Sequence, residues 1–235
     1  MPLSTHTDTI LRISDVEFSW GGDSAFSLAI DDFTIGQRER LLLMGPSGSG
    51  KSTFLSLICG IVSPQTGGIN IAETVISDLR GAARDRFRAE TFGIIFQMFN
   101  LLPYGSITDN VLLPLRFARA RRMRAALQGT PSAEARRLLE RLGLAPSLHR
   151  RAAPTLSVGQ QQRVAVARAL IGAPAVVIAD EPTSALDQDH QEAFLDLLFE
   201  EVARAEATLI MVSHDPALAS RFDRTVALAD IAQQT

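Results

Sequence analysis

The chain has 235 residues, of which 46% are hydrophobic and 21% charged, and its formal net charge is −3. This length and composition suit a globular protein with one large domain, or with a core domain and a subdomain. The nearly balanced charge gives no general reason to expect nucleic acid as a partner.

Compartment and membrane signals are sparse. The single cysteine, Cys59, excludes a disulfide within the chain and lies in an apolar run that favours a buried thiol. No stretch approaches 18 consecutive apolar residues, and residues 1–8 lack the layout of a signal peptide. We therefore expect a cytoplasmic protein, whose membrane role would come through a partner.

In chain order, the predicted elements alternate between strands and helices. Alternating apolar residues predict strands over 9–19 and 25–35, joined by the turn 21–23. The apolar run that ends 38–44 predicts a buried strand leading into a glycine-rich loop, and a helix follows over about 50–59. Further strands are predicted at 92–96, 175–180 and 208–212, and further helices at 160–171 and 188–204.

The region 98–155 is helical by pattern and reads as an inserted subdomain. Pro131 and Ser132 open one helix, which carries leucines at helical spacing. The fold class expected from the whole chain is α/β: a P-loop NTPase core with a mostly parallel sheet, an N-terminal antiparallel β subdomain and this α-helical insertion.

The loop 45–52 carries the strongest chemical signal. It reads Gly-Pro-Ser-Gly-Ser-Gly-Lys-Ser, which fits the phosphate-binding pattern G-x-x-x-x-G-K-[ST] between a strand and a helix. Lys51 is the only lysine among 23 basic residues, and its compact ammonium enters a phosphate cradle that is too tight for a guanidinium. We expect Lys51 to reach the β- and γ-phosphates of a nucleotide and Ser52 to bind Mg²⁺. The alternative is a chance match in a Gly/Ser-rich turn.

Two carboxylates follow the apolar strand that ends at residue 180. Asp180 suits a magnesium ligand, and Glu181 suits a base that polarises the attacking water. The alternative is a helix N-cap cluster, a role that Asp187 could fill without them.

A third motif is Leu-Ser-Val-Gly-Gln at 156–160. Ser157 and Gln160 have the spacing of a capping box that opens the following helix. Because a capped helix N-terminus beside a glycine also attracts anions, capping and phosphate binding are compatible here.

With these motifs in this order, the chain resembles the ATP-binding subunit of ABC transporters over nearly its whole length. The resemblance also includes Ala-Asp-Glu-Pro-Thr at 179–183, Ser-Ala-Leu-Asp at 184–187 and Ser-His-Asp at 213–215. It implies a single ATPase domain over 1–235, with an ATP-binding core of 1–97 and 156–235 and a helical subdomain of about 98–155. It also implies ATP and Mg²⁺ as cofactors and hydrolysis of ATP as the activity.

The resemblance assigns further roles. Trp20 corresponds to the aromatic residue that stacks on adenine, although it could be an ordinary half-buried strand aromatic. Gln97 corresponds to the glutamine that senses magnesium and the membrane partner, and His214 to the switch histidine at the γ-phosphate. Ser184 and Asp187 match a loop that passes between two subunits. The remaining nucleotide contacts implied are Gly45, Ser47, Gly48, Ser49, Gly50 and Thr53 within one chain, and Ser157, Gly159 and Gln160 from a second.

One residue departs from the family pattern. Val158 replaces the first glycine of the usual Leu-Ser-Gly-Gly-Gln, at a position where the family tolerates larger residues. We expect activity to survive this change.

Partners also follow from the resemblance. The first is a second copy of the chain in a head-to-tail dimer. The second is an integral membrane permease that docks near Gln97 and over 98–115. Binding to this permease would place the chain at the cytoplasmic face of the membrane. The segment 97–115 is similar to the lipoprotein-release and macrolide-efflux subfamily, with methionine-type importers as the alternative; a periplasmic component is a further candidate partner. A soluble ABC ATPase acting on DNA or ribosomes is disfavoured, because no heptads follow Gln97 and only one ATPase domain is present.

Arginines gather in the helical insertion. Residues 116–151 contain ten arginines against two glutamates, and five of the arginines fall within 116–124. A solvated helix face is the simpler explanation of these five. The alternative is attraction to anionic lipid headgroups.

Overall fold

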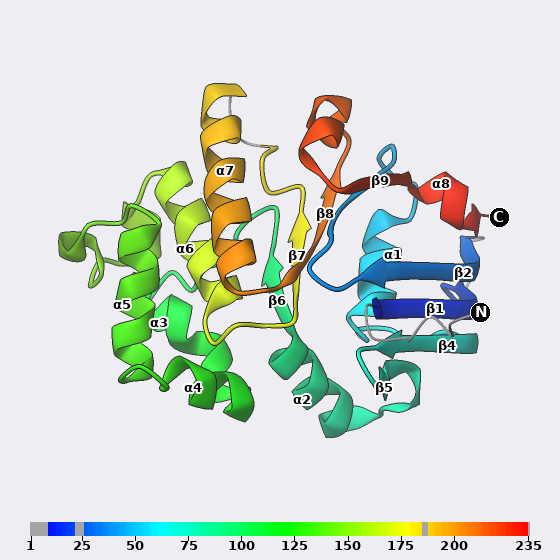
Figure 1. Cartoon of the computed structure of the whole chain (residues 1–235), viewed down its shortest axis with the longest axis horizontal. Helices are drawn as coiled ribbons and strands as arrows, with labels where there is room; N and C mark the ends of the chain where they lie inside the picture. The colour runs from blue at the N-terminus through cyan, green and yellow to red at the C-terminus, as the bar shows by residue number, and fades with distance from the viewer. Residues whose placement is uncertain (1–8, 22–25, 185–187, 235) are drawn as a thin grey trace, which may run out of the picture. The chain divides into compact units, whose positions relative to one another are not determined.

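The chain folds into two compact units in the computed structural model, which describes residues 9–21, 26–184 and 188–234 (Figure 1). The first unit comprises residues 1–88 and 208–235, and the second comprises 89–207. The helix α2 (Gly81–Thr91) carries the chain from the first unit into the second.

An antiparallel sheet forms one layer of the first unit. Its strands β1 (Thr9–Ser19) and β2 (Ser27–Gly36) pair with Val16 opposite Ile30. Apolar residues at alternate positions of both strands are buried, as the period of two requires. The prediction of an N-terminal antiparallel subdomain is therefore confirmed. The other strands of this sheet are β4 (Thr66–Ile71), β5 (Thr74–Val75) and β10 (Gln233–Gln234).

Three parallel strands form the other part of the first unit. The central one, β3 (Arg40–Met44), lies between β8 (Thr208–Ser213) and β9 (Arg224–Ala227). Its leucines are fully buried, as expected for a strand covered on both faces. Helix α1 (Lys51–Ile58) follows β3, and Phe54 packs edge-on against Phe33 of β2. The short elements η2 (Ile76–Asp78), η6 (Pro216–Arg221) and α8 (Leu228–Ile231) complete this unit.

The second unit combines two parallel strands with the helical insertion. Strands β6 (Phe92–Ile95) and β7 (Val176–Asp180) pair in register, with Ile95 opposite Ala179. Helix α6 (Val158–Leu170) packs on β6 so closely that a Cβ on Gly93 would meet the carbonyl oxygen of Ala169 at 2.2 Å. The other helices are α3 (Ile107–Leu112), η3 (Leu113–Arg116), α4 (Arg119–Ala125), α5 (Pro131–Arg141), η4 (Pro146–Leu148), η5 (Ala153–Thr155) and α7 (Gln188–Arg204).

Most predicted elements are present, with three differences. Helix α6 begins at residue 158, two residues before the prediction, because the cap is Ser157. The pattern also missed α2 and the strands β4, β5, β9 and β10, which are short or rich in polar residues and glycine. Finally, the predicted turn 21–23 lies partly outside the described residues, so only its first residue can be placed.

No helix within the described ranges combines the length and the apolar character needed to cross a bilayer. The division into an ATP-binding core and a helical subdomain of about 98–155 stays a prediction.

Candidate functional site

The glycine-rich loop joins β3 to α1 in the first unit. Gly48 and Gly50 have φ values of 80° and 82°, in the left-handed region that favours glycine. A Cβ on Gly50 would meet the Phe26 ring at 2.5 Å, so packing also requires glycine there. Gly50 is the N-cap of α1 and offers no side chain, and the first turn of α1 contains no acidic residue. The amide groups of this helix end are thus left for an external anion.

Lys51 is held over this loop by the loop's own backbone. Its Nζ donates hydrogen bonds of 2.7 Å and 2.8 Å to the carbonyl oxygens of Gly45 and Pro46, and the residue is only 7% exposed. An ammonium group has three N–H donors, so one remains for a ligand. The neighbouring Ser52 is exposed at the start of α1. The loop thus combines left-handed glycines with a buried lysine at a helix start, with Ser47 and Ser49 in the same loop.

Trp20 is fastened to the helix that follows the loop. Its indole N–H donates to Oγ1 of Thr53 at 3.1 Å, and its ring packs edge-on against Phe18. The side chain nevertheless remains 43% exposed. A tethered aromatic ring with an open face is what a stacking role requires.

His214 begins where a neighbouring parallel strand ends. β8 pairs with β3 so that Ser213 lies opposite Met44, the residue before the loop. The exposed His214 therefore starts beside Gly45. Asp215 is occupied in capping η6, since it accepts a hydrogen bond from the amide of Ala217. The structure brings Lys51, Ser52, Trp20 and His214 into one unit.

The second unit presents the carboxylates. Asp180 is the last residue of β7, and Glu181 follows with φ 43°, a rare value for a residue with a side chain. Such backbone conformations concentrate at functional sites. β6 ends beside β7, and Nε2 of Gln97 lies 3.4 Å from Oγ of Ser184. Gln97, Asp180 and Glu181 thus lie at the carboxyl end of the same strand pair, while Asp187 lies outside the described residues.

The start of α6 has the predicted capping box. Ser157 accepts from the amide of Gln160 at 3.3 Å, and the Gln160 side chain accepts from the amide of Ser157 at 3.1 Å. Ser157 and Val158 are exposed, and a Cβ on Gly159 would meet no atom within 4 Å. This helix end is therefore open toward its surroundings.

Two buried side chains of α6 connect this helix to the other motifs of the second unit. Arg168 donates to the carbonyl oxygens of Phe99 and Asn100, just after Gln97, and burial lowers its pKa. Gln162 donates to the carbonyl of Pro182 at 2.5 Å, just after Glu181. Sequence reasoning missed both residues. The available signal was a charged residue within the otherwise apolar run 164–170.

The predicted docking segment 98–115 has an ordered local structure. Ser106 and Asp109 form a second capping box, at the start of α3. The fully buried Asn110 accepts from the amide of Leu102 and donates to its carbonyl, which fixes the loop before α3. Met98 and Tyr104 are highly exposed on this segment. Such exposed large side chains on a fixed loop suit a partner contact.

The five arginines of 116–124 divide into two kinds. Arg121 is only 1% exposed, and its guanidinium donates to the carbonyl oxygens of Ala89, Phe92, Ala169 and Ile171. Burial lowers its pKa to about 10, so it stays charged at neutral pH. Neither a solvated face nor a headgroup contact describes Arg121. The other four, Arg116, Arg119, Arg122 and Arg124, are exposed.

Cys59 is buried as predicted, and burial raises the pKa of its thiol to about 12. Such a thiol is unreactive at neutral pH.

Comparison with known proteins decides the family. Residues 28–184, more than half of the chain, match the ABC transporter family. The chain is an ABC transporter ATP-binding protein. The ABC ATPases hydrolyse ATP, and their α/β cassette combines an antiparallel N-terminal sheet, a parallel sheet and a helical insertion, as the sequence predicted.

Curated ABC relatives align over most of the chain. The ATP-binding protein LolD of the lipoprotein-releasing system of Anaeromyxobacter dehalogenans is 46% identical over 200 residues, which cover 85% of this chain and 81% of the relative. The ABC transporter ATP-binding protein Rv0986 of Mycobacterium tuberculosis is 42% identical over 221 residues. These residues cover 93% of this chain and 86% of the relative.

The ABC cassette MJ0796 is a solved neighbour. Its dimeric structure, in a post-hydrolysis state with ADP and Pi bound, has a TM-score of 0.79 and 30% identity to this chain. The alignment covers 96% of this chain and 97% of MJ0796.

Proposed function

We propose that this chain binds ATP on the loop 45–52 and hydrolyses it with Glu181 as the base. The main support is the environment of Lys51, which is buried and donates hydrogen bonds to two backbone carbonyls, with one N–H left to donate to a phosphate. The uncapped start of α1 adds amide donors for the same phosphates. Trp20 stacks on the adenine, Thr53 orients Trp20, and His214 contacts the γ-phosphate. The loop residues Gly45, Ser47, Gly48, Ser49, Gly50 and Ser52 complete the cradle.

Mg²⁺ fits the oxygen atoms that the motifs present. The ion prefers hard oxygen ligands and often takes only one or two from the protein beside the phosphates. Ser52, Gln97 and Asp180 each offer one oxygen of this kind. When bound, the ion neutralises charge on the phosphate oxygens. The chain's own part is to aim these oxygens and to place Glu181, held by an unusual backbone angle, where it takes a proton from water.

The working form is a head-to-tail dimer around two ATP molecules. Ser157, Gly159 and Gln160 of one chain meet the γ-phosphate bound by Lys51 of the other. The start of α6 supports this, because Ser157 is exposed there and a Cβ on Gly159 would meet no atom within 4 Å. The dimeric structure of MJ0796 gives a precedent within the family.

The dimer drives a permease of the lipoprotein-release or macrolide-efflux type at the cytoplasmic face of the membrane. The permease docks at Gln97 and the segment 98–115, which presents Met98 and Tyr104. The LolD relatives are ATP-binding proteins of lipoprotein-releasing systems, which supports this choice over a methionine-type importer. A periplasmic component would contact the permease on the other side of the membrane. We do not expect nucleic acid as a partner.

Replacing Glu181 with glutamine tests the hydrolytic role. Glu181→Gln keeps the side chain's size but removes its basicity, so ATP turnover is expected to fall roughly 10²–10⁴-fold while ATP still binds. Phosphate release and a binding titration with labelled ATP measure the two effects. Glu192→Gln, the same change at an exposed position of α7, is the matched control and keeps wild-type turnover. Normal turnover in Glu181→Gln would exclude Glu181 as the base.

A further inference from the structure

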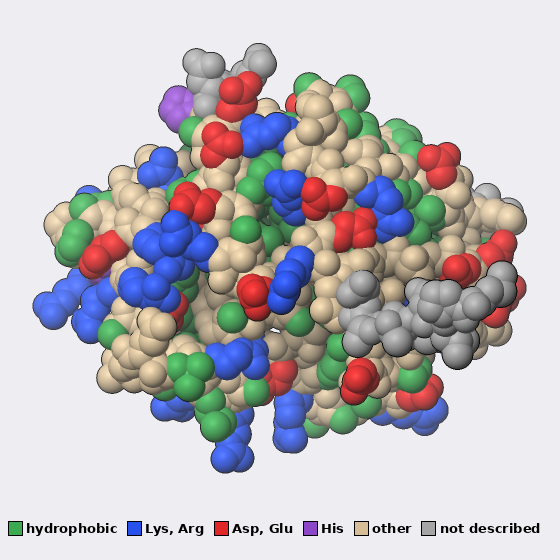
Figure 2. Space-filling model, in the orientation of Figure 1, with side chains coloured by type: hydrophobic (Ala, Val, Ile, Leu, Met, Phe, Trp, Pro, Cys, Tyr) green, Lys and Arg blue, Asp and Glu red, His purple; other side chains and the backbone are tan. Residues whose placement is uncertain are grey.

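The exposed side of α4 and its flanks combines cations with large apolar side chains. Phe117, Met123 and Leu127 are 68%, 62% and 80% exposed, values unusual for side chains of this size. Exposed arginines stand between them in the sequence. Figure 2 shows Lys/Arg side chains and hydrophobic side chains gathered over α4. We call this surface the α4 patch; it consists of Arg116, Phe117, Arg119, Arg122, Met123 and Leu127.

The patch has a fixed orientation because its opposite side is anchored. Arg121 and Ala125 are buried, one turn apart on one face of α4. Arg119, Arg122 and Met123 have the spacing of the other face and are exposed. The five hydrogen bonds of Arg121 to backbone carbonyls hold the helix in this rotation.

The charges of the patch are not neutralised by the protein. The side chains of Arg116, Arg119 and Arg122 make no hydrogen bond or ion pair with any residue that the structure describes. The nearby Glu90 is engaged elsewhere, since its carboxylate accepts from the amides of Ala120 and Arg121 at the start of α4. Three guanidinium groups therefore remain available to an external anion.

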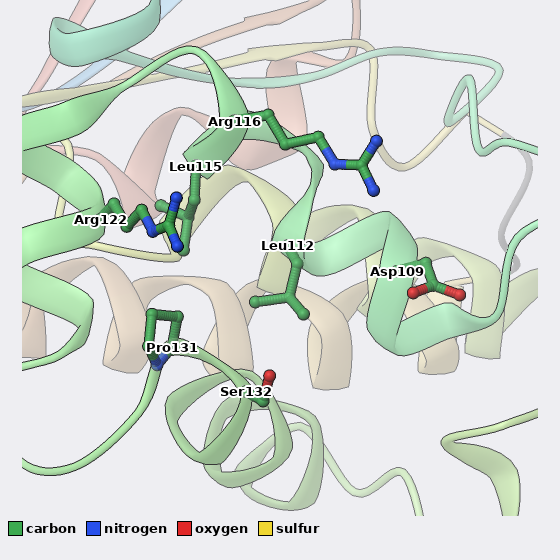
Figure 3. A pocket seen from close by; sticks show the side chains of 7 residues that line it. All are labelled: Asp109, Leu112, Leu115, Arg116, Arg122, Pro131 and Ser132. Carbon is green, nitrogen blue, oxygen red and sulfur yellow. The ribbon is translucent and has the colours of Figure 1, made fainter.

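A pocket of about 290 Å³ lies beside the patch (Figure 3). Figure 3 shows Arg116 and Arg122 on either side of Leu112, whose side chain points into the space between α3, α4 and α5. The one carboxylate in the lining, Asp109, is held by Ser106 in the capping box. The lining of the pocket thus contains two guanidinium groups and the apolar side chains of Leu112, Leu115 and Pro131. Its lining residues are Asp109, Leu112, Leu115, Arg116, Arg122, Pro131 and Ser132.

We propose that the α4 patch contacts an anionic phospholipid membrane surface directly, with a headgroup phosphate between Arg116 and Arg122. An anionic bilayer offers a plane of phosphates with hydrocarbon just beneath, which matches cations interleaved with Phe117, Met123 and Leu127. An acidic protein segment would also satisfy the arginines, and binding to vesicles that contain no protein distinguishes the two. The contact is additional to the permease and does not depend on it.

Vesicles that contain no protein test the proposal. The full chain is sedimented with vesicles of phosphatidylcholine alone or of phosphatidylcholine mixed with phosphatidylglycerol. We expect binding only to the anionic vesicles, weakened by added salt. Arg116→Gln/Arg119→Gln/Arg122→Gln should lose roughly a hundredfold in binding, at about fivefold per arginine. The matched control Arg80→Gln/Arg86→Gln/Arg150→Gln, at three exposed arginines elsewhere, should lose far less.

Two further variants separate the two components of binding. Lysine at positions 116, 119 and 122 keeps the charge, so it should retain binding within about threefold. Phe117→Ser/Met123→Ser/Leu127→Ser should weaken binding and leave a remainder that salt abolishes. Circular dichroism and ATP binding confirm that each variant is folded.

The proposal is overturned if wild-type protein ignores anionic vesicles, if it binds both vesicle types equally, or if the glutamine triple variant binds like wild type. Association with a permease in the absence of vesicle binding would assign the patch to an acidic protein partner. The proposed ATP hydrolysis does not depend on the outcome of these vesicle experiments.

Discussion

Lys51 shows at the residue scale how much depends on the shape of one cation. Its ammonium fits between the carbonyls of Gly45 and Pro46 and is almost entirely buried. A guanidinium carries the same charge, but it is planar and broader and cannot occupy this position without moving the loop. The prevalence of arginine everywhere else in the chain is consistent with Lys51 being the position where the two cations are not interchangeable.

Lys51→Arg is therefore expected to weaken ATP binding by roughly ten- to a hundredfold, the loss of one charge-assisted hydrogen bond. Titration with labelled ATP measures the change. The reverse substitution Arg80→Lys, at an exposed position, should leave affinity unchanged. Wild-type affinity in Lys51→Arg would mean that the cradle does not discriminate between the two cations.

Residues whose role is local were predictable from the sequence, whereas those whose role depends on distant contacts were not. Lys51 and Ser157 act within a few residues of their own position, so motif spacing identified them. Arg121 and Arg168 contact carbonyls some 30 to 70 positions away in the chain, and no local pattern encodes such partners. The same limit made Arg121 look equivalent to its exposed neighbours.

At the scale of elements, Arg121 joins three parts of the second unit. It satisfies the carbonyls of Ala169 and Ile171 at the end of α6, and those of Ala89 and Phe92 where α2 passes into β6. Carbonyls at a helix C-terminus have no partner within their helix and are costly to bury unpaired. Arg121 therefore fixes α4 against α6, the helix that begins at Ser157.

Arg121→Met is expected to lower the free energy of unfolding by about 3–5 kcal/mol, because four carbonyls lose their donor in a buried site. Arg122→Met, the same change at the exposed neighbouring position, should stay within about 0.5 kcal/mol of wild type. Urea denaturation of both variants gives the comparison. Equal stability of the two would contradict the anchoring role.

Element prediction succeeded where hydrophobic periodicity is strong. The buried strands β3, β7 and β8 and the capped helix α6 were predicted within about two residues, and the start of the capped helix α5 was predicted at Pro131. By contrast, β4 contains two adjacent glycines and α2 has no buried side chain, so neither carries a periodic apolar signal. Strand β4 forms through its pairing with β1, which lies far from it in the sequence.

On the scale of the whole molecule, the proposed head-to-tail dimer gives each chain only half of a nucleotide site. The loop with Lys51 offers donors to a triphosphate, and the start of α6, where Ser157 and Gln160 form a capping box, would offer a second set to the nucleotide of another chain. The related cassette MJ0796 forms a dimer with ADP and Pi bound. Bound ATP would then stabilise the dimer, and hydrolysis would let the two chains separate.

Gly159 allows the most direct measurement of this shared site. A Cβ there would meet nothing within 4 Å inside the chain, and an acidic residue in the first turn of α6 interacts favourably with the helix dipole. Gly159→Asp should therefore fold normally and bind ATP, but its carboxylate would repel the γ-phosphate held by a second chain. In the Glu181→Gln background, size-exclusion chromatography should show an ATP-dependent dimer. Adding Gly159→Asp should leave a monomer that still binds ATP, whereas an undiminished dimer would contradict the shared site.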